Sequence, residues 1–172
     1  MKEVLKRKGM VPGAKLAHEF NQTHPEYAFK EWLRYFEFST QHELMKFLAM
    51  SPQGKKWLLF RYTSHTPQLP VYFHKDEFDK CVEQVSINMK QAMWAATPVN
   101  GNSIEYAYNS FMLDGHSRNM EYTLKKWSEY LAFPTVHDLM VFLSESPEGK
   151  DWLDIDYDAS TPPLPLYRFV QQ

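Results

Sequence analysis

Apolar side chains recur at helical spacing in two separate parts of the chain. They lie in residues 25–36 and again in residues 120–131, where they fall three or four positions apart on one face of a helix. The apolar positions are Phe29, Trp32, Leu33 and Phe36 in the first segment and Leu124, Trp127 and Leu131 in the second. This spacing predicts two helices that bury the apolar face.

A second predicted helix follows each of these segments and begins at a threonine. Thr40 precedes Glu43 by three residues, and Thr135 precedes Asp138 by three, which is the spacing of a capping box. The core residues expected of these two helices are Leu44, Met45, Phe47 and Leu48, and Leu139, Met140, Phe142 and Leu143. Ser-Pro pairs at 51–52 and 146–147 then favour a short third helix in each part.

The apolar period next changes from helical to alternating, which is typical of strands. Residues 154–158 alternate acidic and apolar side chains, and Phe60 and Tyr62 alternate in the same way. A turn rich in Thr and Pro leads to a second extended segment in each part, which predicts a β-hairpin. We expect the two hairpins to pair into one sheet, because isolated hairpins are weak.

The same predicted elements occur twice along the chain. Residues 29–73 align without a gap on residues 124–168, at a constant offset of 95. Both segments contain the frame W-x-x-Y-x-x-F-x-T-x-H and end on T-P-x-L-P-x-Y. Such a period is typical of an internal tandem duplication. Residues 14–21 have a further counterpart at 104–109, which is followed by a seven-residue insertion.

The predicted fold is mostly α with small β-hairpins (α+β), built from two pseudo-symmetric helical modules. Residues 1–75 form the first repeat module, residues 76–97 a long connecting helix with one apolar stripe, and residues 98–172 the second repeat module. In this interpretation a residue that is identical in both modules serves first to maintain their shared fold.

Composition is that of a globular protein, with 44% hydrophobic and 16% aromatic residues. No apolar run approaches the roughly 20 residues of a membrane span, and the first residues lack the apolar core of a signal peptide. A cytoplasmic protein without membrane contact is therefore expected. The single cysteine, Cys81, excludes an intramolecular disulfide and any zinc site built from cysteines.

Charge is distributed unevenly between the modules. Residues 1–75 carry 12 Lys and Arg against 6 Asp and Glu, whereas residues 76–172 carry 7 against 15. The candidate binding residues are Arg34, Lys46, Lys55, Lys56 and Arg61 on a basic face, and Glu129, Asp151, Asp154, Asp156 and Asp158 on an acidic face. These charges could join the modules, recruit different partners or simply be solvated, and the three interpretations remain open.

No motif in the sequence predicts a catalytic centre, a cofactor or a resident metal. His42 and His137 each occupy the second position of a capped helix, where the positive end of the dipole opposes a charged imidazole. We interpret both histidines as structural. The alternating acids of 154–158 favour a solvated strand face over a weak cation site. The Ser-Pro-x-Gly-Lys segments lack the spacing of a P-loop.

The sequence is therefore interpreted as a non-enzymatic protein–protein interaction module of adaptor or inhibitor type, of the kind found as viral or mobile-element accessory proteins. Another protein is the expected partner, through the charged faces or the Pro-rich extended segments. A nucleic-acid binder that uses the basic module is the first alternative. A small hydrolase or metal-dependent enzyme is the second. Homo-oligomerisation stays open.

Overall fold

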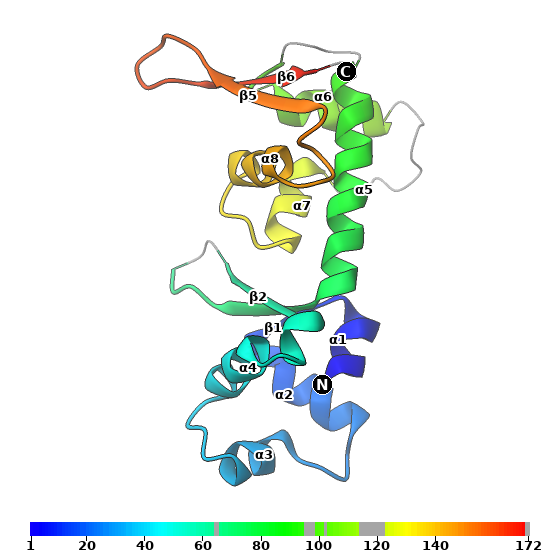
Figure 1. Cartoon of the computed structure of the whole chain (residues 1–172), viewed down its shortest axis with the longest axis vertical. Helices are drawn as coiled ribbons and strands as arrows, with labels where there is room; N and C mark the ends of the chain where they lie inside the picture. The colour runs from blue at the N-terminus through cyan, green and yellow to red at the C-terminus, as the bar shows by residue number, and fades with distance from the viewer. Residues whose placement is uncertain (64–65, 95–98, 102, 114–122, 171–172) are drawn as a thin grey trace. The chain divides into compact units, whose positions relative to one another are not determined.

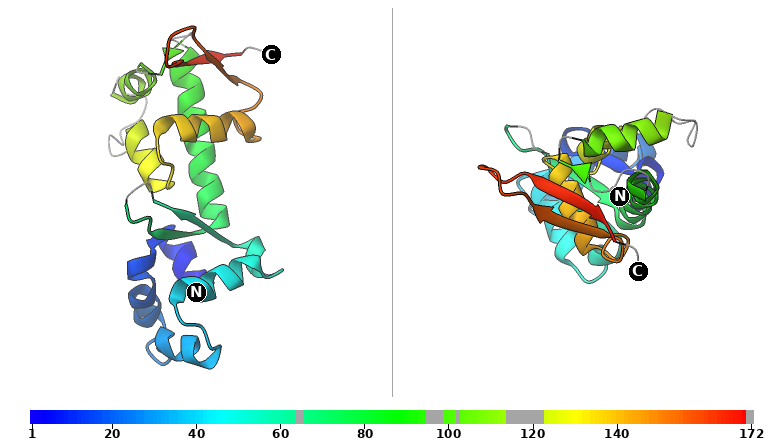
Figure 2. Two further views of the ribbon diagram at one scale, coloured as in Figure 1. Left: turned by 90° about the vertical axis from the view of Figure 1, so that its left-hand side faces the viewer. Right: turned by 90° about the horizontal axis from the view of Figure 1, so that it is seen from above.

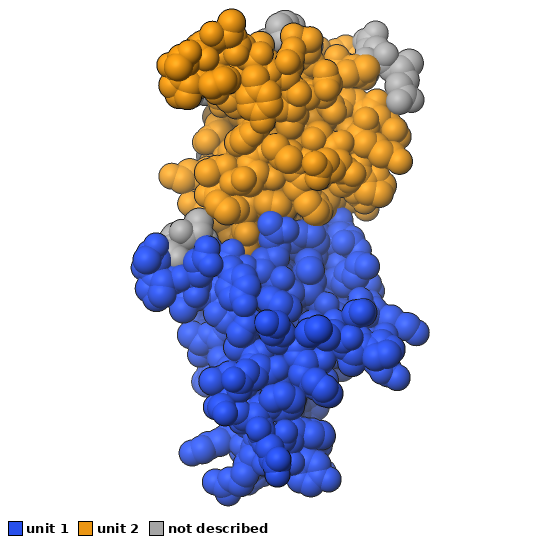
Figure 3. All heavy atoms as spheres, turned by 60° about the vertical axis from the view of Figure 1, so that its left-hand side comes forward, with its two compact units in different colours: residues 1–80 blue, residues 81–172 orange. Residues whose placement is uncertain are grey.

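The computed structural model describes residues 1–63, 66–94, 99–101, 103–113 and 123–170 (Figure 1). Within these residues the chain forms eight α-helices and two three-stranded antiparallel sheets, so the fold is α+β (Figure 2). The chain divides into two compact units, Met1–Lys80 and Cys81–Gln172 (Figure 3). We call them unit 1 and unit 2. Their boundary lies inside helix α5 (Lys75–Trp94), in the region where the sequence predicts a connecting helix.

Unit 1 packs its helices beside one small sheet, in which β3 lies between β1 and β2. Its elements before α5 are α1 (Lys2–Lys8), β1 (Met10–Pro12), α2 (Gly13–Thr23), α3 (Phe29–Tyr35), α4 (Gln41–Met50), the 3₁₀ turn η1 (Gly54–Lys56), β2 (Leu58–Tyr62) and β3 (Pro70–His74). The core gathers buried residues from α1, α2, α4 and the sheet, with Leu5, Leu16, Met45 and Tyr72 almost fully enclosed.

Unit 2 contains most of α5 and a sheet of the same form, in which β6 lies between β4 and β5. Its other elements are β4 (Val99–Asn100), α6 (Ile104–Phe111), α7 (Leu124–Tyr130), α8 (Val136–Glu145), β5 (Leu153–Tyr157) and β6 (Pro165–Phe169). Leu124, Leu131, Met140 and Tyr167 belong to its core.

The structure corrects the predicted hairpins in two ways. Each sheet has a third strand, and the two sheets are separate rather than joined. The added strands, β1 and β4, have only three and two residues, which is too short for an alternating period to be visible in the sequence. Gly13 and Gly101 follow them, and a Cβ atom there would lie 2.9 and 2.8 Å from a ring carbon of Pro70 or Pro165.

The first helix of each frame also begins later than predicted. α3 starts at Phe29 and α7 at Leu124; the part of the second predicted helix at 120–122 lies outside the described residues. The backbone N–H of Phe29 donates to the side-chain oxygen of Asn21 (2.8 Å), and that of Leu124 donates to Asn109 (3.2 Å). A side chain from the preceding helix therefore satisfies the first backbone N–H of each helix, which the apolar spacing does not reveal. α7 has a local N-cap as well, because the Thr123 hydroxyl accepts from the backbone of Lys126.

The threonine caps are confirmed. Thr40 and Glu43 form a reciprocal capping box, and the Thr135 hydroxyl accepts from the backbone of Asp138. The predicted third helix is reduced to the single turn η1 in unit 1. A Cβ atom at Gly54 would collide with the carbonyl of Leu48, so this close approach requires glycine.

No helix within the described residues is both long enough and apolar enough to cross a membrane.

Candidate functional site: an aromatic groove in unit 1

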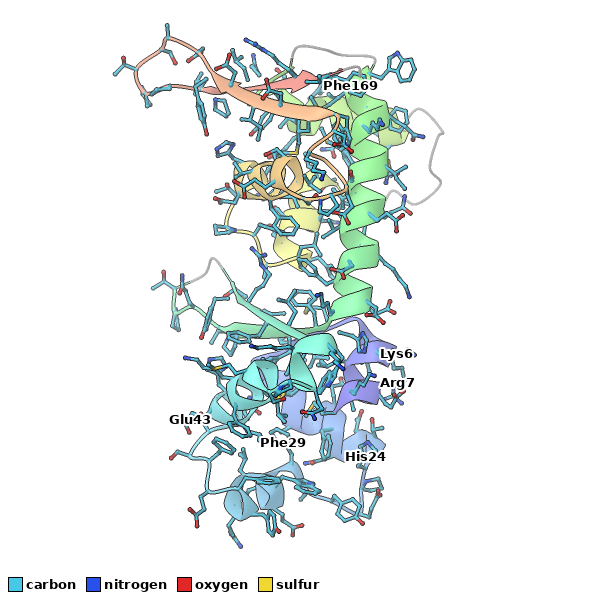
Figure 4. The ribbon with its side chains drawn as sticks, in the orientation of Figure 1. Lys6, Arg7, His24, Phe29, Glu43 and Phe169 are labelled. Carbon is cyan, nitrogen blue, oxygen red and sulfur yellow. The ribbon has the colours of Figure 1, made fainter. Side chains whose placement is uncertain are left out.

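An apolar groove of about 410 Å³ opens between α2, α3 and α4 of unit 1. Seven of its nine lining residues are aromatic residues or leucines. The full lining is Met1, Phe20, His24, Tyr27, Phe29, Trp32, Phe36, Leu44 and Leu48. Figure 4 labels two of these residues, His24 and Phe29, which lie on the side of α3 that faces the other helices of unit 1.

Helix α3 exposes aromatic rings that the sequence pattern predicts to be buried. Trp32 is 38% exposed and Phe36 is 49% exposed, and Tyr35 beside them is 77% exposed. Trp32 stacks on Phe36 with ring centroids 5.7 Å apart, and it lies edge to face with Tyr35 at 6.4 Å. These rings therefore pack on one another instead of filling the core. Phe47 on α4 was also predicted to be buried, and it is 58% exposed.

A second hollow of about 310 Å³ continues this surface. Tyr27, Glu31, Trp32 and Tyr35 line it, so two of its residues are shared with the groove. Contiguous exposed apolar surface of this kind marks interaction sites in soluble proteins far more often than scattered single residues do.

Helix α3 is held at both of its ends and packs mainly against α2. Phe29 at its first turn is buried, capped by Asn21 and packed against Phe20 with ring centroids 5.4 Å apart. At its other end the chain turns through Glu37 with φ 57°, and the N–H of Phe38 donates to Leu33. α3 packs against α2 but has no comparable contact with α4.

Unit 2 closes the equivalent surface. α7 packs against both α6 and α8. Trp127, which corresponds to Trp32, is only 9% exposed, and Leu131, which corresponds to Phe36, is fully buried. The prediction of a buried apolar face is therefore confirmed for α7. In α3 it holds for Phe29, which is buried, and for Leu33, which packs against the core, and it is wrong for Trp32 and Phe36.

The two histidines join helix to sheet in both units. The ring nitrogens of His42 are hydrogen-bonded to the hydroxyls of Tyr72 (2.7 Å) and Tyr62 (2.8 Å). Those of His137 are hydrogen-bonded to Tyr167 (2.9 Å) and Tyr157 (3.2 Å). Burial raises the pKa of Tyr72 and that of Tyr167 well above their ordinary values, so both phenols stay neutral. The arrangement holds α4 and α8 against their sheets.

The predicted basic residues come together only in part. Lys46 on α4 and Lys55 and Lys56 on η1 are exposed on two elements that pack against each other. Arg34 lies on another helix, α3. The Arg61 guanidinium lies 5.9 Å from the centroid of the Phe78 ring, where it contributes a cation–π contact inside the unit.

The predicted acidic residues also divide between elements. Glu129 lies on α7, Asp151 in the turn before β5, and Asp154 on β5 itself. Asp156 on β5 forms an ion pair with Arg168 at 2.8 Å.

Asp158 stabilises the turn after β5. Its carboxylate accepts hydrogen bonds from the Ser160 side chain and from the backbone N–H of Leu164, which hold its pKa below the ordinary value. Among the described His, Cys, Asp and Glu residues, no group of three is placed to hold a metal ion.

The groove was not predicted from the sequence, because the frame residues of α3 and α7 have the same spacing. One signal was available: the positions of Phe29 and Phe36 hold Leu124 and Leu131 in the second segment, so α3 carries more aromatic side chains than α7. No family model matches this chain, and neither the curated proteins nor the solved structures contain a match to it.

Proposed function

We propose that this chain is a non-enzymatic protein-binding module and that the aromatic groove of unit 1 is its recognition surface. The observation that supports the proposal is the exposure of Trp32, Tyr35 and Phe36 around an open apolar groove. Aromatic side chains supply much of the binding energy at protein interfaces, because they bury large areas and lose little conformational entropy. A groove walled by helices is also the usual receptor for an amphipathic segment.

We also propose that the two units are diverged copies of one module. Its support is that residues 95 positions apart make the same contacts. His42 and His137 each bridge two tyrosines, and Glu37 and Ala132 both have positive φ. In this view unit 2 keeps the closed form of the module, and unit 1 has become the receptor.

An affinity-capture experiment tests the function. The full chain is compared with Phe36→Glu, which puts a charge on the groove, and with Tyr106→Glu, which changes a 76% exposed aromatic residue on α6. We expect one partner protein to be retained by the wild type and by Tyr106→Glu after nuclease treatment. Phe36→Glu should lose it while keeping the circular dichroism spectrum and Tm of the wild type.

Two results would overturn the proposal. Equal capture by Phe36→Glu and the wild type would remove the groove as the binding surface. Capture that disappears with nuclease, and that depends on Lys46, Lys55 and Lys56, would instead identify a nucleic-acid binder, whose affinity should fall steeply with salt.

A further inference from the structure

The second hollow of unit 1 is bounded by three aromatic rings and one carboxylate. Tyr27, Trp32 and Tyr35 supply the rings, and Glu31 supplies the carboxylate. The face of an aromatic ring carries negative partial charge, which attracts a cation placed over it. A carboxylate adds a full negative charge beside the rings. The lining of the second hollow is therefore complementary to a cation.

The period of α3 brings three of these residues together. Glu31 and Tyr35 are four positions apart, and Trp32 and Tyr35 are three apart, so they are neighbours on the helix surface. Tyr27 comes from the turn before α3, where its backbone N–H donates to the carbonyl of His24 at 3.1 Å. One short stretch of chain thus builds the whole lining.

The three rings are inclined steeply to one another. The centroids of Tyr27 and Trp32 are 6.2 Å apart with an angle of 56° between the ring planes, and those of Trp32 and Tyr35 are 6.4 Å apart with an angle of 79°. Trp32 also stacks on Phe36, which holds the indole in place. At these separations a cation can lie within about 6 Å of both rings of either pair, which is the range of a cation–π contact.

The Glu31 carboxylate is available to a ligand. Its side chain is exposed, and it forms no ion pair with any Lys, Arg or His that the structure describes. Lys30 and Arg34 lie near it on α3, but the described lining of the second hollow includes neither of them. A cation that enters among the rings therefore meets a carboxylate without a competing partner.

Unit 2 differs at the corresponding positions. At the offset of 95, Lys126 stands where unit 1 has Glu31, whereas the tryptophan and the second tyrosine recur as Trp127 and Tyr130. Trp127 is only 9% exposed, and residue 122, the counterpart of Tyr27, lies outside the described residues. The exposed tryptophan is therefore the one that has a carboxylate beside it.

We propose that the second hollow binds a trimethylated lysine side chain of a partner protein. This inference rests on the proposed function and specifies one residue of the partner. A quaternary ammonium group has no N–H donors, and aromatic rings are its usual protein ligands. An unmethylated lysine ammonium is strongly hydrated, and a planar guanidinium stacks on a single ring face. Rings inclined at 56° and 79° suit a rounded group better than a flat one.

The position of the second hollow favours a protein as the source of this cation. The hollow shares Tyr27 and Trp32 with the aromatic groove. One peptide segment can therefore place a methylated lysine in the hollow and a neighbouring apolar side chain in the groove. The volume of about 310 Å³ is at the lower end for a ligand site, which suits a single side chain.

An NMR titration of the isotope-labelled full chain tests the hollow directly. The probe is N-acetyl-trimethyllysine amide, and the readout is the indole N–H signal of Trp32, one of five tryptophans, which Trp32→Phe identifies by its loss. We expect a saturable shift. A neutral analogue, in which a tert-butyl group replaces the trimethylammonium, should bind at least about tenfold more weakly, because it has the same shape without the charge.

Two variants and a matched control complete the titration. Tyr35→Ala removes a ring that is 77% exposed and should weaken binding about fivefold. Glu31→Lys introduces the residue found at this position in unit 2 and should weaken binding at least as much. Tyr106→Ala, at a tyrosine of α6 that is 76% exposed, should change nothing. Equal binding of the probe and its neutral analogue, or of the wild type and Tyr35→Ala, would overturn the inference.

Competition in the affinity-capture experiment separates this inference from the proposed function. About 20 mM probe, enough to occupy even a weak site, should release the captured partner, whereas the unmethylated lysine analogue of the same charge should not. If Phe36→Glu abolishes capture but the probe has no effect, the groove remains the recognition surface and the trimethyllysine inference is wrong. Binding to phosphatidylcholine vesicles that Tyr35→Ala abolishes would replace the protein side chain by a lipid headgroup.

Discussion

His74 and Phe169 occupy the same place in the two sheets. His74 pairs with Leu58 and stacks on Trp57, with centroids 6.4 Å apart, whereas Phe169 pairs with Leu153 and packs on Trp152 at 6.3 Å. His74 is 2% exposed, and within the described residues neither of its ring nitrogens has a hydrogen-bond partner; Asp76 is 3.9 Å from Nδ1.

Replacing His74 by phenylalanine should therefore stabilise the protein. Burial of an unpaired polar group costs about 1–3 kcal/mol, and phenylalanine already fits the equivalent site in unit 2. We expect Tm to rise by several degrees in a calorimetric scan. The reverse change, Phe169→His, should lower Tm. A lower Tm for His74→Phe would show that the imidazole makes a favourable contact.

The turn after β5 should make stability depend on pH. The pKa of Asp158 is lowered in the folded state, so its ionised form stabilises the fold above about pH 3.9, the ordinary value for aspartate. This contribution disappears as the pH falls through the lower folded pKa.

Asp158→Thr should keep the turn and remove this dependence. In unit 1 the equivalent residue, Thr63, accepts the same hydrogen bond from Leu69 through its hydroxyl, at 3.2 Å. Urea denaturation between pH 2 and pH 6 should show a shallower loss of stability in acid for Asp158→Thr than for the wild type. Identical slopes would mean that the carboxylate contributes nothing to the fold.

The two tyrosines bonded to His42 should differ in importance. Tyr72→Phe removes the hydroxyl of a fully buried side chain and should cost about 1–2 kcal/mol, because an imidazole nitrogen loses its partner inside the protein. Tyr62→Phe acts where the ring is 40% exposed and water can replace the hydroxyl, so its cost should be near zero. Equal losses in chemical denaturation would contradict this difference.

Ser86 should contribute measurably to unit 2. Ser86→Ala removes a hydrogen bond of 2.7 Å, but the Glu148 carbonyl keeps a second donor in the Trp152 ring N–H, also at 2.7 Å. We therefore expect a modest loss of about 1 kcal/mol. Ser103→Ala, at an exposed position, is the control and should be neutral. If the two variants have the same free energy of unfolding, the Ser86 hydroxyl does not anchor α5.

Local features of the fold were predictable from the sequence, and those that depend on distant partners were not. The caps at Thr40 and Thr135 and the alternation along β5 are set by residues close in the chain. The third strands are too short to show a period. Whether the apolar face of α3 or α7 is covered depends on its contacts with neighbouring helices, which the spacing of its own residues does not reveal.

The charged faces illustrate the same limit. The sequence assigns Arg61 to a basic face and Asp156 to an acidic face, but each has a partner inside its own unit, the Phe78 ring and Arg168. A count of charged residues gives the net charge of a region. It does not show which of those residues form contacts within the folded unit.

The open groove of unit 1 links folding to recognition. A partner that binds the groove only in the folded state would raise the unfolding free energy of unit 1 by an amount that grows with the logarithm of that partner's concentration. The abundance of the partner would then set how often unit 1 opens, and so how long the protein survives proteolysis in a cell.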